Sequence, residues 1–178
     1  MDQLFEIKLV SPTKEHEKAA LEYIKEHLEC NEVDLHGGAM LEKTEPYTKW
    51  LERLEKNSNE KTVVPGWVTS STFFVIRKND NKLIGMIDIR HRLNTFLAEY
   101  GGHIGYGVCP SERGKGYGTQ ILQLGLAHCE KIGLTKVMVA CYKENEASSK
   151  IIRTCGGVFE REFLYTDGKI VQIFWITI

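Results

Sequence analysis

The spacing of apolar residues predicts a chain of alternating helices and strands. Apolar residues recur every three or four positions in the predicted helices, while the predicted strands are short runs rich in β-branched and aromatic residues. Strands are predicted over 4–10, 71–77, 83–89, 103–108, 136–142, 158–165 and 170–178. Helices are predicted after Ser11-Pro12-Thr13 and over 44–56, 119–131 and 146–154, and 91–102 is predicted to be irregular or partly helical.

Capping residues and apolar stripes define the two N-terminal helices. The second of them has Thr44 as its predicted N-cap and Pro46 in its first turn. The first helix would bury Ala19, Ala20, Tyr23, Ile24, Leu28 and Cys30. The second would bury Trp50, Leu51 and Leu54.

The order of the predicted elements, β-α-α-β-β-β-α-β-α-β-β, limits the fold. The strand–helix–strand segment 103–142 implies a parallel crossover, and the hairpins at 71–89 and 158–178 are antiparallel. We therefore predict an α/β (α+β) fold with a single domain over 1–178, built on a mixed central β-sheet with helices on both faces.

Composition and charge exclude several classes of protein. The 178 residues suit one domain, and 42% of them are hydrophobic, as in globular proteins with a buried core. Lys and Arg number 23 against 24 Asp and Glu, so the net charge is −1 and no overall basic field attracts nucleic acid. No run of about 18 apolar residues predicts a membrane span. The start, MDQLFEIKLV, lacks a basic stretch followed by an apolar core, so we expect a cytoplasmic protein without a secretory leader.

The five cysteines do not form a recognisable metal or redox motif. No C-x-x-C pair is present, and no cysteine has a histidine at zinc-finger spacing. We expect reduced thiols that pack as small apolar side chains, and no bound metal.

The segment from Val108 to Thr119, V-C-P-S-E-R-G-K-G-Y-G-T, joins a predicted strand to a predicted helix. Its alternating glycines let backbone N–H groups point into one concavity and let a ligand approach closely. The helix N-terminus adds the positive end of its dipole, and Arg113 and Lys115 add positive charge. This arrangement is typical of a pyrophosphate-binding loop, and the alternative is a glycine-rich turn that serves only tight packing.

The order of glycines in this loop matches neither a Walker A loop nor the G-x-G-x-x-G fingerprint. It reads Arg113-x-x-Gly116-x-Gly118, and it resembles the R/Q-x-x-G-x-G/A signature of the GNAT acetyltransferase superfamily. The resemblance runs from about Trp67 to the end of the chain, and it implies that this part binds acetyl-coenzyme A. The residues of the loop that it assigns to the cofactor are Val108, Arg113, Gly114, Lys115, Gly116, Tyr117, Gly118 and Thr119.

A second match lies downstream, where Asn145-x-x-Ser148 follows the predicted strand 136–142. The resemblance implies that Asn145 contacts the pantetheine arm of the cofactor and that Ser148 fills a position for a small residue, although Asn145 can also be a helix cap. The sequence departs from the family at Ile152, where a tyrosine often protonates the departing thiolate. Since a thiol of pKa about 8.5 leaves readily, this departure does not exclude transfer.

The resemblance implies direct attack of an acceptor amine on the thioester, which requires a group that takes the amine proton. The candidates near the glycine loop are Glu99, His103 and Tyr106, and for each a structural role is the alternative. Tyr142 is the predicted replacement acid. The backbone N–H near Val108 is the predicted donor to the acyl oxygen, and the pantetheine arm would lie along the strand like an added strand.

The acceptor is a small-molecule or peptide amine whose identity the sequence leaves open. Arg90, with Arg92, could bind a carboxylate or phosphate, or could belong to a solvated loop; Asn94 and Trp67 are the other candidate acceptor residues. Two other functions stay open: a non-catalytic acyl-coenzyme A sensor, and a nucleotide-binding protein that uses the same loop. The apolar strand 170–178 could pair with a second subunit in a homodimer or be covered within the monomer.

Overall fold

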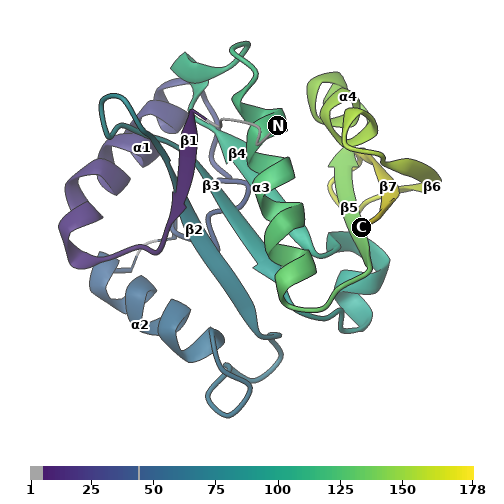
Figure 1. Cartoon of the computed structure of the whole chain (residues 1–178), viewed down its shortest axis with the longest axis horizontal. Coiled ribbons are helices and arrows are strands. Elements are labelled where there is room, and N and C mark those ends of the chain that lie inside the picture. The colour runs from purple at the N-terminus through teal and green to yellow at the C-terminus, as the bar shows by residue number, and fades with distance from the viewer. Residues whose placement is uncertain (1–5, 44) are drawn as a thin grey trace.

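The computed structural model describes residues 6–43 and 45–178, and its elements follow the predicted order (Figure 1). The helices are α1 (Glu17–Glu29), α2 (Tyr47–Asn57), α3 (Tyr117–Lys131) and α4 (Glu146–Thr154). The strands are β1 (Ile7–Val10), β2 (Ser70–Arg77), β3 (Leu83–Arg90), β4 (Ile104–Val108), β5 (Lys136–Tyr142), β6 (Val158–Leu164) and β7 (Ile170–Thr177). Short 3-10 helices form at Lys14–His16 and Pro110–Glu112, and a π-helical turn forms at Leu97–Gly101.

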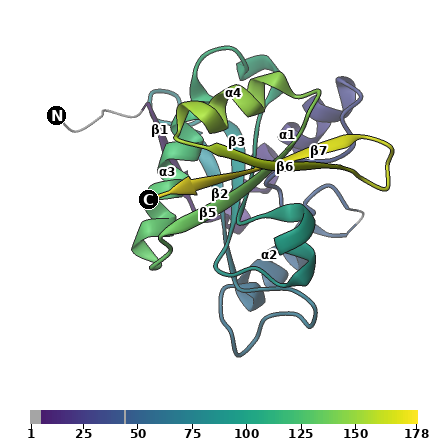
Figure 2. The same ribbon diagram turned by 90° about the vertical axis from the view of Figure 1, so that its right-hand side faces the viewer.

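The helices cover both faces of the sheet, as predicted. On one face α1 and α2 pack around Trp50, Phe74 and Met86, all fully buried. On the other face α3 packs over β3 and β4, and α4 packs against α3 and β5; the buried cluster there includes Ile87, Ile121 and Ile152. Figure 2 looks onto β5, β7 and β6, the second half of the same sheet.

Several predicted details of the helices are wrong. Leu28 and Cys30 lie outside the buried stripe of α1 and are exposed, because the helix turns them toward solvent at its C-terminal end. Pro46 is the N-cap of α2 rather than part of its first turn, and the predicted cap Thr44 lies outside the described residues. The helix after the glycine loop starts at Tyr117, two residues earlier than predicted, because Gly116 already takes the left-handed conformation that begins it.

Seven strands form one sheet in the order β1-β2-β3-β4-β5-β7-β6, antiparallel except for the parallel neighbours β4 and β5. The ladder between β3 and β4 is complete from Ile89–Ile104 to Gly85–Val108. Between β4 and β5, only Ile104 and Val139 are in register, and the two strands then separate. The sheet is therefore split along its middle, toward the C-terminal ends of β4 and β5.

The C-terminal strand is internal. β7 pairs with β5 on one side and with β6 on the other, so both of its edges are occupied within the monomer. Two alternatives were predicted for this strand, pairing with a second subunit or coverage within the monomer, and the structure shows coverage within the monomer. Among the described residues, no helix has the length and apolar character needed to cross a membrane.

Candidate active site

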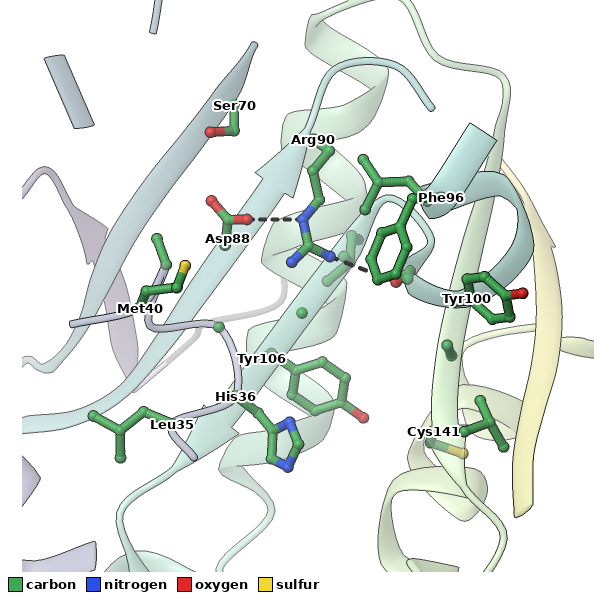
Figure 3. A pocket seen from close by; sticks show the side chains of 18 of the residues that line it. Leu35, His36, Met40, Ser70, Asp88, Arg90, Phe96, Tyr100, Tyr106 and Cys141 are labelled. Carbon is green, nitrogen blue, oxygen red and sulfur yellow. Dashed lines mark hydrogen bonds and ion pairs between the residues drawn. The ribbon is translucent and has the colours of Figure 1, made fainter. Parts of the chain in front are cut away.

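A cavity of about 560 Å³ lies where β4 and β5 separate (Figure 3). Segments from the whole chain form its wall. They are the loop 35–42, the loop 66–70, the end of β3, the segment 94–101, the start of β4, the end of β5, the start of α4 and the β6–β7 turn. The separation of β4 and β5 thus leaves a cavity within the sheet. From this cavity β4 runs on to the loop that precedes α3.

That loop presents open backbone to solvent. Gly114 and Gly116 have φ of 76° and 82°, and a Cβ on either would meet no atom within 4 Å. Thr119 follows within the first turn of α3, where N–H groups have no partner within the helix. A diphosphate is the kind of anion that such a helix start accommodates.

Two residues of the loop face the protein rather than the open side. The Tyr117 ring is buried in the core beneath α3, so only its backbone belongs to the loop surface. A Cβ on Gly118 would lie 2.6 Å from Cδ1 of Ile151, so this glycine allows α3 to pack closely on α4. For Gly118, therefore, packing accounts for the absence of a side chain.

The cations of the loop are held by carboxylates. Arg113 donates from Nη1 and Nη2 to both oxygens of Glu32, at 2.6 and 2.7 Å, and from Nε to the carbonyl of Val108 at 3.0 Å. Lys115 donates to the buried carboxylate of Glu112 at 2.9 Å. Glu112 also accepts from two cations of the β2–β3 hairpin, and hydrogen bonds from its lysine partners lower its pKa to about 2.

His103 is a structural residue in this fold and does not line the cavity. The ring Nδ1 of His103 accepts the backbone N–H of Met138 at 3.0 Å, and the backbone N–H of His103 donates to the carbonyl of Met138 at 2.8 Å. The ring is buried against Trp175, and burial lowers its pKa to about 4. His103 thus fixes β4 to β5 just before the strands separate, and we remove it from the candidate bases.

We expect the neutral His103 ring to make stability depend on pH. The folded chain takes up this proton only near pH 4, whereas an unfolded histidine takes it up near pH 6.5, so the contribution is complete above that value and is lost as pH falls. Urea unfolding of the wild type should show a loss of up to about 3 kcal/mol between about pH 7 and pH 4 that His103→Gln lacks. Equal pH slopes in the two proteins would contradict this role.

The other predicted proton-transfer residues separate into two groups. Glu99 lies exposed on the π-helical turn and does not line the cavity. Tyr106 and Tyr142 both line it; Tyr106 shares a hydrogen bond of 3.2 Å with Ser148, and Tyr142 donates to Asp167 at 2.7 Å. Burial raises the pKa of Tyr106 to about 12, and the bond to Asp167 together with burial does the same for Tyr142. Both phenols stay neutral; Tyr142 is the donor in its hydrogen bond, whereas either hydroxyl can donate in the bond between Tyr106 and Ser148.

Asn145 and Ser148 lie together at the cavity wall, at the N-terminus of α4. The side-chain oxygen of Asn145 accepts the backbone N–H of Ser148 at 3.0 Å, so the capping role predicted as an alternative is confirmed. The hydroxyl of Ser148 reaches across to Tyr106, so the pair joins α4 to β4 over the split.

The predicted acceptor residues Arg90, Asn94 and Trp67 all line the cavity. Arg90 does not carry a free charge, because its Nε binds Asp88 at 2.8 Å (Figure 3). Asn94 closes the neighbouring loop by donating to the carbonyl of Gly66 at 3.2 Å. Arg92 is exposed, pairs with Glu60 and lies outside the cavity.

The loop 35–42 is a part of the site that the sequence pattern did not reveal. A Cβ on Gly37 would lie 2.7 Å from the carbonyl oxygen of Gly105, and one on Gly107 would lie 2.8 Å from that of His36. The glycines of β4 thus let this loop lie directly on the strand, which brings His36 beside Tyr106 (Figure 3). The pair Gly37-Gly38 was the available signal, since such close approaches require residues without a Cβ.

Comparisons with known proteins agree on one family. A model of the acetyltransferase (GNAT) domain matches residues 9–158. No curated protein is similar enough in sequence to count as a match.

Among solved structures, a ribosomal-protein-S5-alanine acetyltransferase from Vibrio fischeri has a TM-score of 0.75 at 18% identity, over 98% of this chain and 94% of that one. RimL, a ribosomal L7/L12 alpha-N-protein acetyltransferase in complex with coenzyme A, has a TM-score of 0.71 at 16% identity, over 98% and 96%. A chimera of the spermidine N-acetyltransferase SpeG from Vibrio cholerae and hSSAT has a TM-score of 0.67 at 16% identity, over 97% and 96%. At these identities the similarity concerns the fold.

Proposed function

This chain belongs to the GNAT acetyltransferase family, and on that premise we propose that it transfers an acetyl group from acetyl-coenzyme A to the primary amine of a small-molecule or peptide acceptor. The observation that carries this proposal is the split sheet that ends at an open glycine loop. The split offers unpaired backbone to the pantetheine amides, and the loop offers N–H groups and the start of α3 to the diphosphate.

The fit of coenzyme A rests on features of this chain. Gly114 and Gly116 have free space where phosphate oxygens would approach, and Arg113 and Lys115 flank them. The cavity lies between β4 and β5, so the thioester of a cofactor held along β4 would face an acceptor bound in the cavity. We propose that Asn145 and Ser148 contact the pantetheine arm from the opposite wall.

In the proposed reaction the amine nitrogen attacks the acetyl carbonyl carbon, the new C–N bond forms and the C–S bond breaks. Starting from the ammonium form, one proton goes to the departing thiolate and one to solvent, so that atoms and charges balance. Of the described groups lining the cavity, we assign the uptake of the amine proton to His36, since Asp88 is paired with Arg90 and the phenols stay neutral. Backbone N–H groups near Val108 would donate to the acyl oxygen as negative charge develops there.

We assign to Tyr142 a hydrogen bond to the departing thiolate, in place of the tyrosine that Ile152 replaces. A phenol of pKa about 12 does not protonate a thiolate of pKa about 8.5 completely, but it stabilises the charge by donation once its hydroxyl proton turns from Asp167 to the thiolate. Tyr142→Phe should lower kcat about tenfold, as measured by thiol release. Tyr106→Phe, which removes the cavity hydroxyl already bonded to Ser148, should lower it less than about threefold, and the reverse order would contradict the assignment.

The decisive experiment separates enzyme, sensor and nucleotide-binding protein. Calorimetry should detect binding of coenzyme A, and thiol release from acetyl-coenzyme A should depend on an added primary amine. Binding without turnover on any amine of a broad panel would favour the sensor. Thermal stabilisation by ATP or NAD, but not by coenzyme A, would favour the nucleotide-binding protein.

A further inference from the structure

The charged groups in the wall of the cavity leave one carboxylate without a cation among the described lining residues. The lining residues with formal charge are Glu42, Asp88 and Arg90, a net charge of −1. Asp88 is buried, accepts from the hydroxyl of Thr72 at 2.8 Å and binds Arg90 at 2.8 Å. The Asp88–Arg90 pair is therefore neutral as a unit. Besides its bond to Asp88, the Arg90 guanidinium makes only long contacts within the described residues, 3.4 and 3.5 Å from Nη1 to backbone carbonyls.

Glu42 differs from this pair. Its side chain is 11% exposed, and its Oε2 is buried without a hydrogen-bond partner among the described residues. The nearest cation is Lys43, whose Nζ lies 3.7 Å from the other oxygen and whose side chain is half exposed. A buried carboxylate oxygen without a donor costs free energy. A rotation of the Glu42 side chain that turns this oxygen into the cavity, toward a cationic donor, recovers that cost.

The rest of the cavity wall is apolar and rich in aromatic rings. Phe96 and Tyr100 are exposed by 54% and 38% of their surface although both line the cavity, and their ring centroids lie 5.4 Å apart. Exposed rings of this kind bind apolar bodies and attract cations to their faces. The aromatic lining residues are Trp67, Phe96, Tyr100, Tyr106, Tyr142 and Tyr165.

We propose that Glu42 binds the ammonium group of the acceptor, and that the acceptor is an amine with an apolar or aromatic body and no acidic group. The inference rests on the proposed transferase function and narrows its substrate class. An acceptor carboxylate would enter a cavity of net negative charge whose guanidinium is already neutralised by Asp88, so it pays desolvation without gaining an ion pair. In this proposal Arg90 shapes the wall rather than selecting an anionic acceptor, which is the anion-binding role that the sequence left open beside a solvated loop.

The test uses two acceptors that differ only in a carboxylate, 2-phenylethylamine and phenylalanine. The wild type should prefer 2-phenylethylamine by about tenfold or more in kcat/KM. Glu42→Gln, which keeps the size but removes the charge, should raise KM for 2-phenylethylamine about tenfold with kcat changed less than about threefold, and should shrink the preference. The matched control is Glu60→Gln, which makes the same substitution at an exposed position outside the cavity. It should leave kcat and KM for 2-phenylethylamine unchanged.

Several outcomes would overturn the inference. They are a preference for phenylalanine, an unchanged KM in Glu42→Gln, a fall in kcat alone, or acetylation of other amines while 2-phenylethylamine is not used. Binding of coenzyme A by calorimetry, measured with the same proteins, distinguishes this failure from failure of the proposed function. If coenzyme A binds and some amine is acetylated, only the acceptor assignment is lost; if coenzyme A does not bind, the transferase proposal itself is wrong.

Discussion

Replacing Gly116 by aspartate is expected to weaken coenzyme A binding about a hundredfold, with the fold intact. The new side chain would enter free space, because no atom lies within 4 Å of the position of its Cβ. Its charge would face the proposed diphosphate site at the N-terminus of α3, where two like charges repel in a partly dehydrated loop. Calorimetric titration with coenzyme A measures the effect directly.

A matched control separates this charge effect from backbone strain. Gly133 has φ of 88° and free space for a Cβ, but it follows the C-terminal end of α3. Gly133→Asp therefore carries the same left-handed strain, about 1–2 kcal/mol, without touching the proposed site. Equal coenzyme A affinities in the two folded variants would show that the diphosphate does not bind at Gly116.

Replacing Gly37 by alanine should destabilise the protein by about 2–4 kcal/mol, from strain and overpacking combined. Gly37 has φ of 75°, and a Cβ there would lie 2.7 Å from the carbonyl oxygen of Gly105 and 2.8 Å from that of Met86. Both are backbone atoms of paired strands, so the loop 35–42 must move away from β4, and it carries His36 and Glu42 with it. Urea unfolding measures the loss of stability, and a raised KM for the acceptor amine would report the displaced cavity wall.

Here the matched control is Gly133→Ala, which adds the same methyl group at positive φ into free space. It should destabilise by only about 1–2 kcal/mol. If both alanine variants lose the same free energy of unfolding, the close approach of the loop 35–42 to β4 does not contribute to stability. The explanation that Gly105 and Gly107 lack side chains so that this loop can lie on β4 would then be wrong.

The sequence allowed the order of elements to be predicted because each helix and strand has its own local periodicity. The glycine loop was also predictable, since glycines at positive φ and the start of a helix are features of one contiguous segment. The role of His103 was not, because its partner Met138 is far away in sequence and only the folded sheet brings the two together. A histidine next to a glycine-rich strand has the same local pattern whether it binds a backbone N–H or a substrate.

The cavity wall was predicted only in part for the same reason. Seven of the predicted site residues line the cavity: Trp67, Arg90, Asn94, Tyr106, Tyr142, Asn145 and Ser148. Glu42 belongs to a loop without regular spacing, and nothing near it in sequence distinguishes a buried carboxylate from a solvated one. Its burial depends on how that loop packs on the strands.

The parting of β4 and β5 also affects how this protein avoids aggregation. A bare strand edge can recruit a foreign strand, and the split gives the sheet inner edges in addition to its outer ones. The outer edges are poor templates: β1 spans four residues, and β6 carries Glu160, Arg161 and Glu162 in succession with an irregular register. The inner edges face each other within one molecule, so an extended thioester ligand fits them better than a second polypeptide does.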